Sequence, residues 1–376
     1  MRSTTRILDR FLQAMKTSNC IVQGIEGDFP VHTAVRDALP EDTRILRADR
    51  HSVSAIWYLV GVIHALDGMG MPVLYFVKYA VGHLGFLLTG GRTYAMRNIG
   101  RYMPEAVPRT MSHGSMSSGD HDLPAGSFFL QSLVNFESHD QLDPSTAAQG
   151  VARLHLLSVG SSDRFGSQFP MYDELFCHVQ GMESDWAVLF GRMLCQAFLC
   201  NRSVNGHWEE LDFVTRLTLA HVVPRLLGSL DQDRGGIKPC LIHGGGLRDG
   251  NMGKEVQTGR YFLFNSNGFW GHNEMELGIW EATLGPSRSA EYRAEYFKRV
   301  RPAEPASEVE DRIRLYMVNA LAGMKYLLMK YVPGYLRDMH SLPLPAELPY
   351  RGFVEEPQCT WERSEIMRDL WNGQDE

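Results

Sequence analysis

The chain has 376 residues, with 37 Lys and Arg against 44 Asp and Glu, and therefore a formal net charge of −7. This length allows a sizeable buried core, so we expect a bilobal unit or two domains rather than a small module. The acidic balance and the lack of a lysine or arginine run disfavour nucleic acid and anionic membranes as partners.

The first segment, MRSTTRILDRFLQAMKTSNC, has no apolar core long enough for a secretory signal. The most apolar stretch, WYLVGVIHALDGMGMPVLYFVKYAVG, is interrupted by His64, Asp67 and Pro72, which argues against a membrane span. The six cysteines include no CxxC pair, so buried thiols are favoured over disulfides or a zinc site. We therefore expect a cytoplasmic protein.

Residues 1–135 are predicted to form a small β-rich lobe with an N-terminal helix and one helix packed on the sheet. SAIWYLVGVIHAL and PVLYFVKYA, separated by DGMGMP, are typical of a β-hairpin. Residues 112–126, SHGSMSSGDHDLPAG, are small and polar and are predicted to be a loop. His113, His121 and His139 are irregularly spaced around it, which indicates solvent exposure rather than a metal site.

Residues 136–340 are predicted to form a larger helical lobe. Three segments place apolar residues three and four positions apart, as amphipathic helices do: DWAVLFGRMLCQAFLC, ELDFVTRLTLAHVVPRLLGSL and EDRIRLYMVNALAGMKYLLMKYV. YFLFNSN, residues 261–267, is the one segment in this region predicted to contain a strand. Residues 341–376 are expected to be a proline-rich extension that wraps the surface.

The segment KPCLIHGGGLRDGNMG, followed by GRYFLFNSNGFWGHNEMELGIW, carries the most specific motif. It resembles the fructosamine kinase (ketosamine-3-kinase) family, especially its fungal members, whose pattern runs close to PCLIHGDLWxGN and then FDxAxxxxHxEMExGMW. VLYFVK, FFLQ, ARLHLLS and HVVPRLLG also match in the family's order. The resemblance implies an α+β, bilobal protein-kinase-like fold of the aminoglycoside phosphotransferase type.

Phosphoryl transfer in such folds requires a lysine on the phosphates, an orienting glutamate, an aspartate at the attacked hydroxyl, and an asparagine with a second aspartate on magnesium. The resemblance places Lys78 and Asn251 at two of these positions. It places Gly245, Asn265 and Arg92 at the other three, where the family has acids. Asp249 lies two residues before Asn251, whereas the family's base lies five before, so it does not simply replace the lost aspartate.

Three functions are open from the sequence. The first is a repurposed enzyme that uses the interlobe cleft for ATP-independent isomerisation or cyclisation of a small organic molecule. Secondary-metabolite biosynthesis is a setting in which such an enzyme would act. The second is an inactive pseudokinase that serves as a binding or scaffold module, and the third is a ketosamine-3-kinase with residual activity. The replacements by glycine and asparagine leave the cleft open and polar, which favours the first.

The candidate site residues follow from the first hypothesis. His243, His272 and Asp249 are predicted to transfer protons, because both imidazoles ordinarily titrate near neutrality. A structural role for His243, bracing the loop, is the competing interpretation, and Glu276 is expected to be structural. No cofactor or metal is expected, and the sequence leaves the oligomeric state open. The residues predicted to bind a substrate are Lys78, Arg92, Asn251, Asn265 and Gly245.

Overall fold

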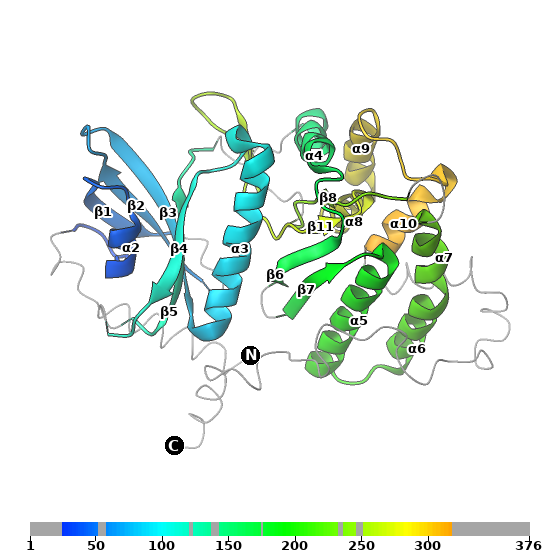
Figure 1. Cartoon of the computed structure of the whole chain (residues 1–376). Helices are drawn as coiled ribbons and strands as arrows, with labels where there is room; N and C mark the ends of the chain where they lie inside the picture. Colours follow the sequence, from blue (N-terminus) through cyan, green and yellow to red (C-terminus); the bar gives the residue numbers. More distant parts are fainter. Residues whose placement is uncertain are drawn as a thin grey trace, which may run out of the picture.

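The computed structural model describes residues 25–51, 58–119, 123–136, 143–173, 176–231, 236–245 and 251–317. Two lobes lie side by side: one contains a five-stranded sheet, and the other consists mainly of helices (Figure 1). The expected α+β, bilobal architecture is therefore observed. The predicted N-terminal helix and the extension at 341–376 lie outside the described residues.

The sheet of the first lobe has the spatial order β1-β2-β3-β5-β4, and all neighbouring strands run antiparallel. Its strands are β1 (Arg44–Arg50), β2 (Leu59–Leu66), β3 (Pro72–Val81), β4 (Thr110–Met116) and β5 (Gly126–Ser132). The hairpin predicted around DGMGMP is confirmed as β2–β3. Its turn is closed by Asp67, whose Oδ1 accepts the backbone N–H groups of Met69 and Met71, each at 2.9 Å.

Strand β3 positions Lys78. Successive side chains of a strand point to opposite faces, so Val77 and Tyr79 enter the core of this lobe while Lys78 faces the other way. Lys78 pairs with Val60 of β2 and Phe129 of β5 in the ladder, so its backbone is held on both sides. The helix α2 (Thr33–Ala38) contributes Val35 to the same core.

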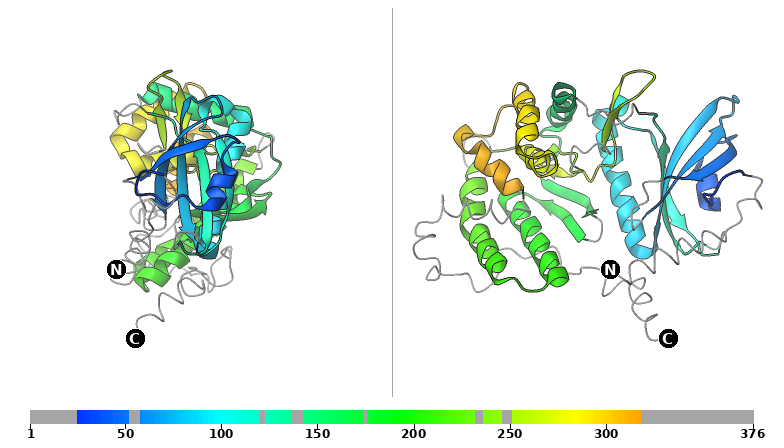
Figure 2. Two further views of the ribbon diagram at one scale, coloured as in Figure 1. Left: turned by 90° about the vertical axis from the view of Figure 1, so that its left-hand side faces the viewer. Right: turned by 180° about the vertical axis from the view of Figure 1, so that it is seen from behind.

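Helix α3 (Gly82–Tyr102) lies between this sheet and the second lobe (Figure 1, Figure 2). It packs on β3 and β5 and also on β6 (Phe165–Asp173). The approach to β6 is close at Gly90, where a Cβ atom would lie 2.6 Å from Cζ of Phe169, so a larger residue would push that ring aside. Arg92 lies two residues further along the same helix.

The sequence-based assignment was wrong at two places. Residues 112–126 were predicted as loop, yet β4 covers 110–116; as an edge strand it needs one partner only, so small polar residues are tolerated. The hairpin of β6 and β7 (Phe176–Glu183) was not predicted within the helical lobe. Register shifts between Ser167 and Tyr172 interrupt the alternation that would mark this hairpin in the sequence. Strand β6 also pairs with the distant β11 (Trp270–Gly271), which in turn pairs with β8 (Cys240–Leu241).

The second lobe contains helices at each of the three predicted segments, although residues 318–332 of the third lie outside the described residues. Residues 210–230, predicted as one helix, form α6 and α7 joined by a π-helical turn, η4, just before Pro224. The predicted strand in YFLFNSN is β10, which pairs with β9. The helices and remaining short elements are η2 (Pro104–Ala106), α4 (Pro144–Ser158), α5 (Trp186–Asn205), α6 (Glu209–Leu217), η4 (Thr218–Val222), α7 (Val223–Leu227), η5 (Gly228–Asp231), β9 (Met252–Lys254), β10 (Tyr261–Leu263), α8 (Glu274–Leu284), α9 (Pro286–Phe297), η6 (Ala306–Glu308) and α10 (Val309–Tyr316).

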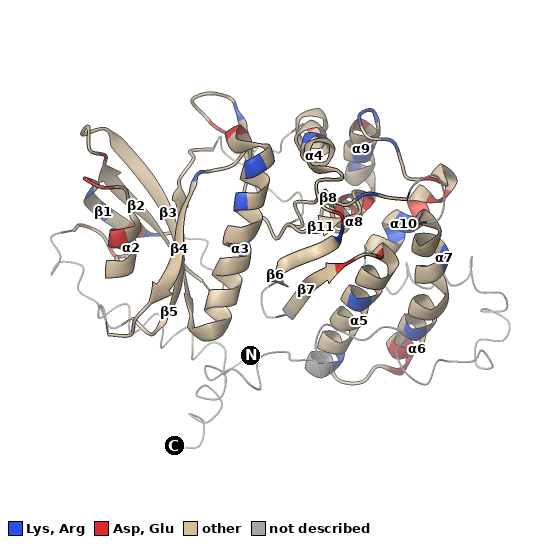
Figure 3. Cartoon of the chain, viewed as in Figure 1, with Lys and Arg blue, Asp and Glu red and all other residues tan. Residues whose placement is uncertain are grey.

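The charged residues are interspersed along the elements of both lobes (Figure 3). None of the described helices combines the length and the apolar character that crossing a membrane requires. Four cysteines, Cys177, Cys195, Cys200 and Cys240, are buried free thiols, as expected. The division of the lobes at residue 135 stays a prediction; β5 ends at Ser132 and α4 begins at Pro144.

A buried ion pair connects α8 to α10. Arg312 donates to both carboxylate oxygens of Glu274, at 2.7 and 3.0 Å, and both side chains are fully buried. Glu274 also accepts the backbone N–H of Ala303 at 2.7 Å, and Arg312 donates to the carbonyl of Ala303 at 2.7 Å. Each charge therefore has its partners, which burial of an ion pair demands.

We expect Glu274→Gln to lower the free energy of unfolding by about 3–5 kcal/mol, because it leaves the buried Arg312 without its counter-charge. The control is Glu105→Gln, which removes the surface pair with Arg153, whose side chains are 43% and 54% exposed. This control variant should lower the free energy of unfolding by less than about 1 kcal/mol. Denaturant titration of both variants measures the difference, and equal losses would contradict the structural role of the buried pair.

Candidate functional site

Four polar side chains from different elements meet where the two lobes face each other. Lys78 comes from β3, Arg92 from α3, Asn251 from the residue before β9, and Asn265 from the segment after β10. Lys78 Nζ donates to Asn265 Oδ1 at 3.0 Å, and Asn265 Nδ2 donates to Asn251 Oδ1 at 2.8 Å. Asn251 Nδ2 in turn donates to the carbonyl oxygen of Gly245. Four of the five predicted binding residues are thus linked by one hydrogen-bond chain.

The direction of this chain is fixed at both ends. At one end, the amine of Lys78 donates to Asn265 Oδ1. At the other end, the carbonyl oxygen of Gly245 can only accept a hydrogen bond. The two carboxamides between them must therefore point their oxygens toward Lys78 and their N–H groups toward Gly245. As a result, the NH₂ group of Asn265 faces the side-chain oxygen of Asn251.

Arg92, the fifth predicted binding residue, reaches the same point from α3. Its Nη1 donates to the backbone carbonyl of Asn265, whose backbone is left-handed with φ 56°. Its Nε is buried and has no hydrogen-bond partner among the described residues. The expectation that Arg92 faces Lys78 therefore agrees with the geometry, since both side chains contact Asn265.

The surroundings of Lys78 carry no negative charge within the described part of the chain. Neither Lys78 nor Arg92 forms an ion pair with any described carboxylate. Burial, and then the charge of Arg92, lower the pKa of Lys78 to about 7. The rings of Tyr58 and Phe76 lie 5.2 and 5.5 Å from Nζ. Sequence reasoning missed both rings, although Phe76 is two residues before Lys78 and therefore on the same face of β3.

Helix α8 holds the HGG segment, residues 243–245, in place through Glu276. Glu276 Oε2 accepts the backbone N–H groups of His243 and Gly244, at 2.6 and 3.2 Å. Gly244 adopts φ 69°, and a Cβ atom there would lie 2.8 Å from the carbonyl oxygen of Asn267, so glycine is required. Burial raises the pKa of Glu276 to about 7, although the two N–H donors lower it. These contacts agree with the structural role expected for Glu276.

His243 braces the loop with both ring nitrogens. Nε2 donates to the carbonyl of Phe264 at 3.0 Å, and Nδ1 accepts the N–H of Gly245 at 3.3 Å, which defines a neutral tautomer. The ring is fully buried. Burial lowers the pKa of His243 to about 4, so the expectation that it titrates near neutrality is wrong. The contacts support the competing interpretation, a residue that braces the loop.

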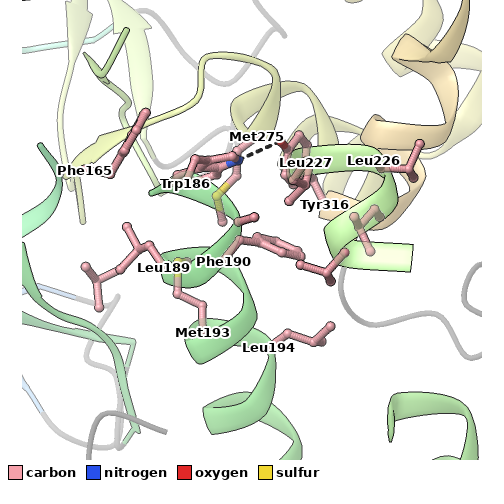
Figure 4. Close-up of a cluster of buried hydrophobic side chains, with 14 of the residues drawn as sticks. Phe165, Trp186, Leu189, Phe190, Met193, Leu194, Leu226, Leu227, Met275 and Tyr316 are labelled. Atoms are coloured by element: carbon pink, nitrogen blue, oxygen red, sulfur yellow. Dashed lines mark hydrogen bonds between the residues drawn. The ribbon is translucent and has the colours of Figure 1, made fainter. Parts of the chain in front are cut away.

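His272 is not part of the hydrogen-bonded group. Its Nδ1 shares a 2.8 Å hydrogen bond with the hydroxyl of Tyr316, which also accepts from Trp186 Nε1 at 2.8 Å. Figure 4 shows Trp186 and Tyr316 joined within a cluster of buried apolar side chains of this lobe. Burial lowers the pKa of His272 to about 4, so the second near-neutral imidazole expected from the sequence is also excluded.

Two further sequence predictions concern polar residues of this region. Asp249 lies outside the described residues. His113 is not in a solvent-exposed loop; it lies in β4, half-buried, with its ring 5.0 Å from that of Phe86. His121 and His139 lie outside the described part. In the described residues, no three His, Cys, Asp or Glu side chains are grouped closely enough to hold a metal ion.

The architecture and the site define a member of the kinase-like class. The family model for fructosamine kinase matches residues 90–340. The chain belongs to the fructosamine kinase family. The match begins within α3, so it includes Arg92 and the HGG segment but not Lys78.

Solved structures that share the fold include two that superpose over most of this chain. A protein from Thermobifida fusca assigned as a fructosamine-3-kinase superposes with a TM-score of 0.56 at 16% identity, over 79% of this chain and 98% of that one. Another so assigned, from Haemophilus somnus, gives a TM-score of 0.51 at 15% identity, over 75% and 85%. The kinase-like fold expected from the sequence is confirmed. No curated protein sequence matches this chain.

We expect Asn265→Asp to raise the pKa of Lys78 from about 7 toward its ordinary value, because a carboxylate would replace the neutral oxygen 3.0 Å from Nζ. The control, Asn265→Ala, removes the same acceptor without adding a charge and should leave the pKa low. The acetylation rate of Lys78 across a pH series, followed by peptide mass spectrometry, measures the shift. An identical profile in the Asp variant and the parent would contradict the assigned contact.

Proposed function

We propose that this protein has lost phosphoryl transfer and uses the interlobe cleft, in the cytoplasm, for ATP-independent chemistry on a small anionic organic molecule, of the isomerase or cyclase kind. The observation that carries the proposal is the hydrogen bond from Asn265 to Asn251. By the family's pattern, these two residues occupy the positions that hold magnesium. Instead of two oxygen ligands, an N–H group and an oxygen face each other.

The charge of the site supports the same conclusion. Magnesium requires oxygen ligands and is commonly bound through carboxylates and substrate phosphates. Here the two positions present carboxamides, and the guanidinium of Arg92 bonds the carbonyl of Asn265. A divalent cation placed there would displace an N–H donor and meet the positive charges of Lys78 and Arg92. An anionic group of a substrate would be attracted by both.

Lys78 is the group in this site best suited to proton transfer or covalent chemistry. His243 and His272 are buried, neutral and engaged with other groups, so we do not assign them a catalytic role. The pKa of Lys78, about 7, leaves a large fraction of its amine neutral near physiological pH. A ligand site without chemistry, as in a pseudokinase, is the alternative.

Magnesium-dependent binding of ATP is the first test. Calorimetry with Mg-ATP should give no saturable heat in the micromolar range, because Asn265 stands where the family has a magnesium-binding aspartate and its N–H group faces the oxygen of Asn251. An inactive member of the family that had kept its nucleotide site would bind Mg-ATP. Saturable, magnesium-dependent binding, or transfer of labelled phosphate to a ketosamine, would overturn the proposal and favour a ketosamine kinase.

Restoring the two family aspartates is the second test. The double variant Gly245→Asp, Asn265→Asp should show no phosphoryl transfer. A Cβ atom at position 245 would lie 2.9 Å from the backbone oxygen of Asn265 and 3.0 Å from Cε1 of His243, so the new side chain would be displaced. The single Asn265→Asp variant is the control for folding. Phosphorylation of a ketosamine by the double variant would mean that the kinase geometry is intact.

A further inference from the structure

Lys78 differs from Lys298, another described lysine, in what it contacts. Its acceptor is a neutral carboxamide oxygen, and the charge of a described residue that acts on it is that of the cation Arg92. By contrast, Lys298 is on the surface and pairs with the carboxylate of Glu295. A carboxylate holds a lysine in its charged form, whereas a second cation disfavours that form.

We propose that the amine of Lys78 forms an imine with the carbonyl carbon of a small 2-oxo acid whose carboxylate is bound by Arg92. The inference rests on the proposed function in one respect: the cleft must be free of Mg-ATP. It adds the class of substrate and a covalent step to that function.

The positions of the two cations match this class of substrate. Lys78 bonds the side-chain oxygen of Asn265, and Arg92 bonds the backbone oxygen of the same residue, so both groups are within one residue's span. In a 2-oxo acid, the carboxylate and the carbonyl carbon are joined by a single bond. Arg92 uses one N–H on Asn265 and has its buried Nε unpartnered among the described residues, so N–H donors are available for a carboxylate.

The reactivity of Lys78 follows from its environment. Only a neutral amine has the free electron pair that attacks a carbonyl. An ordinary lysine, with a pKa of about 10.4, is almost wholly charged at neutral pH. The pKa of Lys78 is lowered to about 7 by burial and by Arg92, so a large fraction is neutral there. Desolvation together with an adjacent cation is a known way to activate a lysine for imine formation.

The reaction balances without any oxidant or reductant. The electron pair of Nζ forms a bond to the carbonyl carbon, and the carbonyl oxygen takes up a proton from the amine to give a carbinolamine. The carbon–oxygen bond then breaks, and the oxygen leaves as water with the second amine proton. The product is an imine between Nζ and the former carbonyl carbon. Hydrolysis reverses each step.

The test is reductive trapping with pyruvate as the probe. The full-length protein is incubated with pyruvate and cyanoborohydride, which delivers hydride to the imine carbon and leaves a stable carboxyethyl group on the lysine. Peptide mass spectrometry then measures the modified fraction of each lysine. We expect at least about tenfold more adduct on Lys78 than on Lys298 at neutral pH, in line with the difference in neutral amine.

Two comparisons separate the parts of the inference. Acetone carries a methyl group where pyruvate carries the carboxylate, so it should label Lys78 at least about tenfold less, the effect of a lost charge-assisted contact. Arg92→Gln should reduce labelling by pyruvate to the level of acetone. Because this variant also raises the pKa of Lys78, it is compared at about pH 9, where the amine is largely neutral in the parent.

The outcomes are distinguishable from failure of the proposed function. Equal labelling of Lys78 and Lys298 by pyruvate overturns the imine, even if Mg-ATP does not bind. Labelling of Lys78 that is the same with pyruvate and acetone, or the same in Arg92→Gln at high pH, overturns the role of Arg92. Magnesium-dependent ATP binding overturns the proposed function instead. Lys78→Met, with its fold checked by circular dichroism, must lose the Lys78 adduct and keep that on Lys298.

Discussion

The hydrogen-bond chain from Lys78 through Asn265 and Asn251 to the carbonyl of Gly245 determines the character of the candidate site. An amine that donates at one end and a carbonyl that can only accept at the other fix the orientation of both carboxamides. The chain joins the sheet of one lobe to the loop of the other without any charged acceptor. A carboxylate at position 265 would place an acceptor against the oxygen of Asn251, which only a cation or a proton between them could reconcile.

No described carboxylate lies against Lys78 or Arg92, and this affects both cations. Lys78 has no described carboxylate to keep it charged, and Arg92 adds repulsion from α3. Lys78 and Arg92 both contact the neutral Asn265 and repel each other, and an anion bound between them would relieve this repulsion. In the function proposed above, this feature disfavours magnesium and favours an anionic ligand and a neutral amine.

The first turn of α8 supplies the framework beneath this site. Glu276 holds the N–H groups of His243 and Gly244, and Glu274, two residues earlier, holds the buried Arg312 of α10. One carboxylate thus shapes the loop while the other connects the helix to the rest of the lobe. The imidazoles of His243 and His272 belong to this framework, because each is buried and hydrogen-bonded within the lobe.

The sequence by itself determined the elements whose signal is local. Alternating apolar residues around DGMGMP gave the β2–β3 hairpin, apolar spacing gave α5 and the α6–α7 region, and the HGGG and HNEME segments gave the family. It also placed Lys78, Arg92, Asn251 and Asn265 together, through the motif order. Only the tertiary structure decided the edge strand β4, whose small polar residues carry no strand pattern, and the β6–β7 hairpin, whose ladder is irregular and whose strand β6 also pairs with the distant β11. The tertiary structure also decided the protonation of the titratable groups. A pKa depends on burial and on neighbouring groups, and the position of a residue in the sequence specifies neither. A histidine in a glycine-rich loop was therefore taken for a proton donor, whereas the fold makes it a buried brace. Burial by the same fold lowers the pKa of Lys78, a strand residue, to about 7.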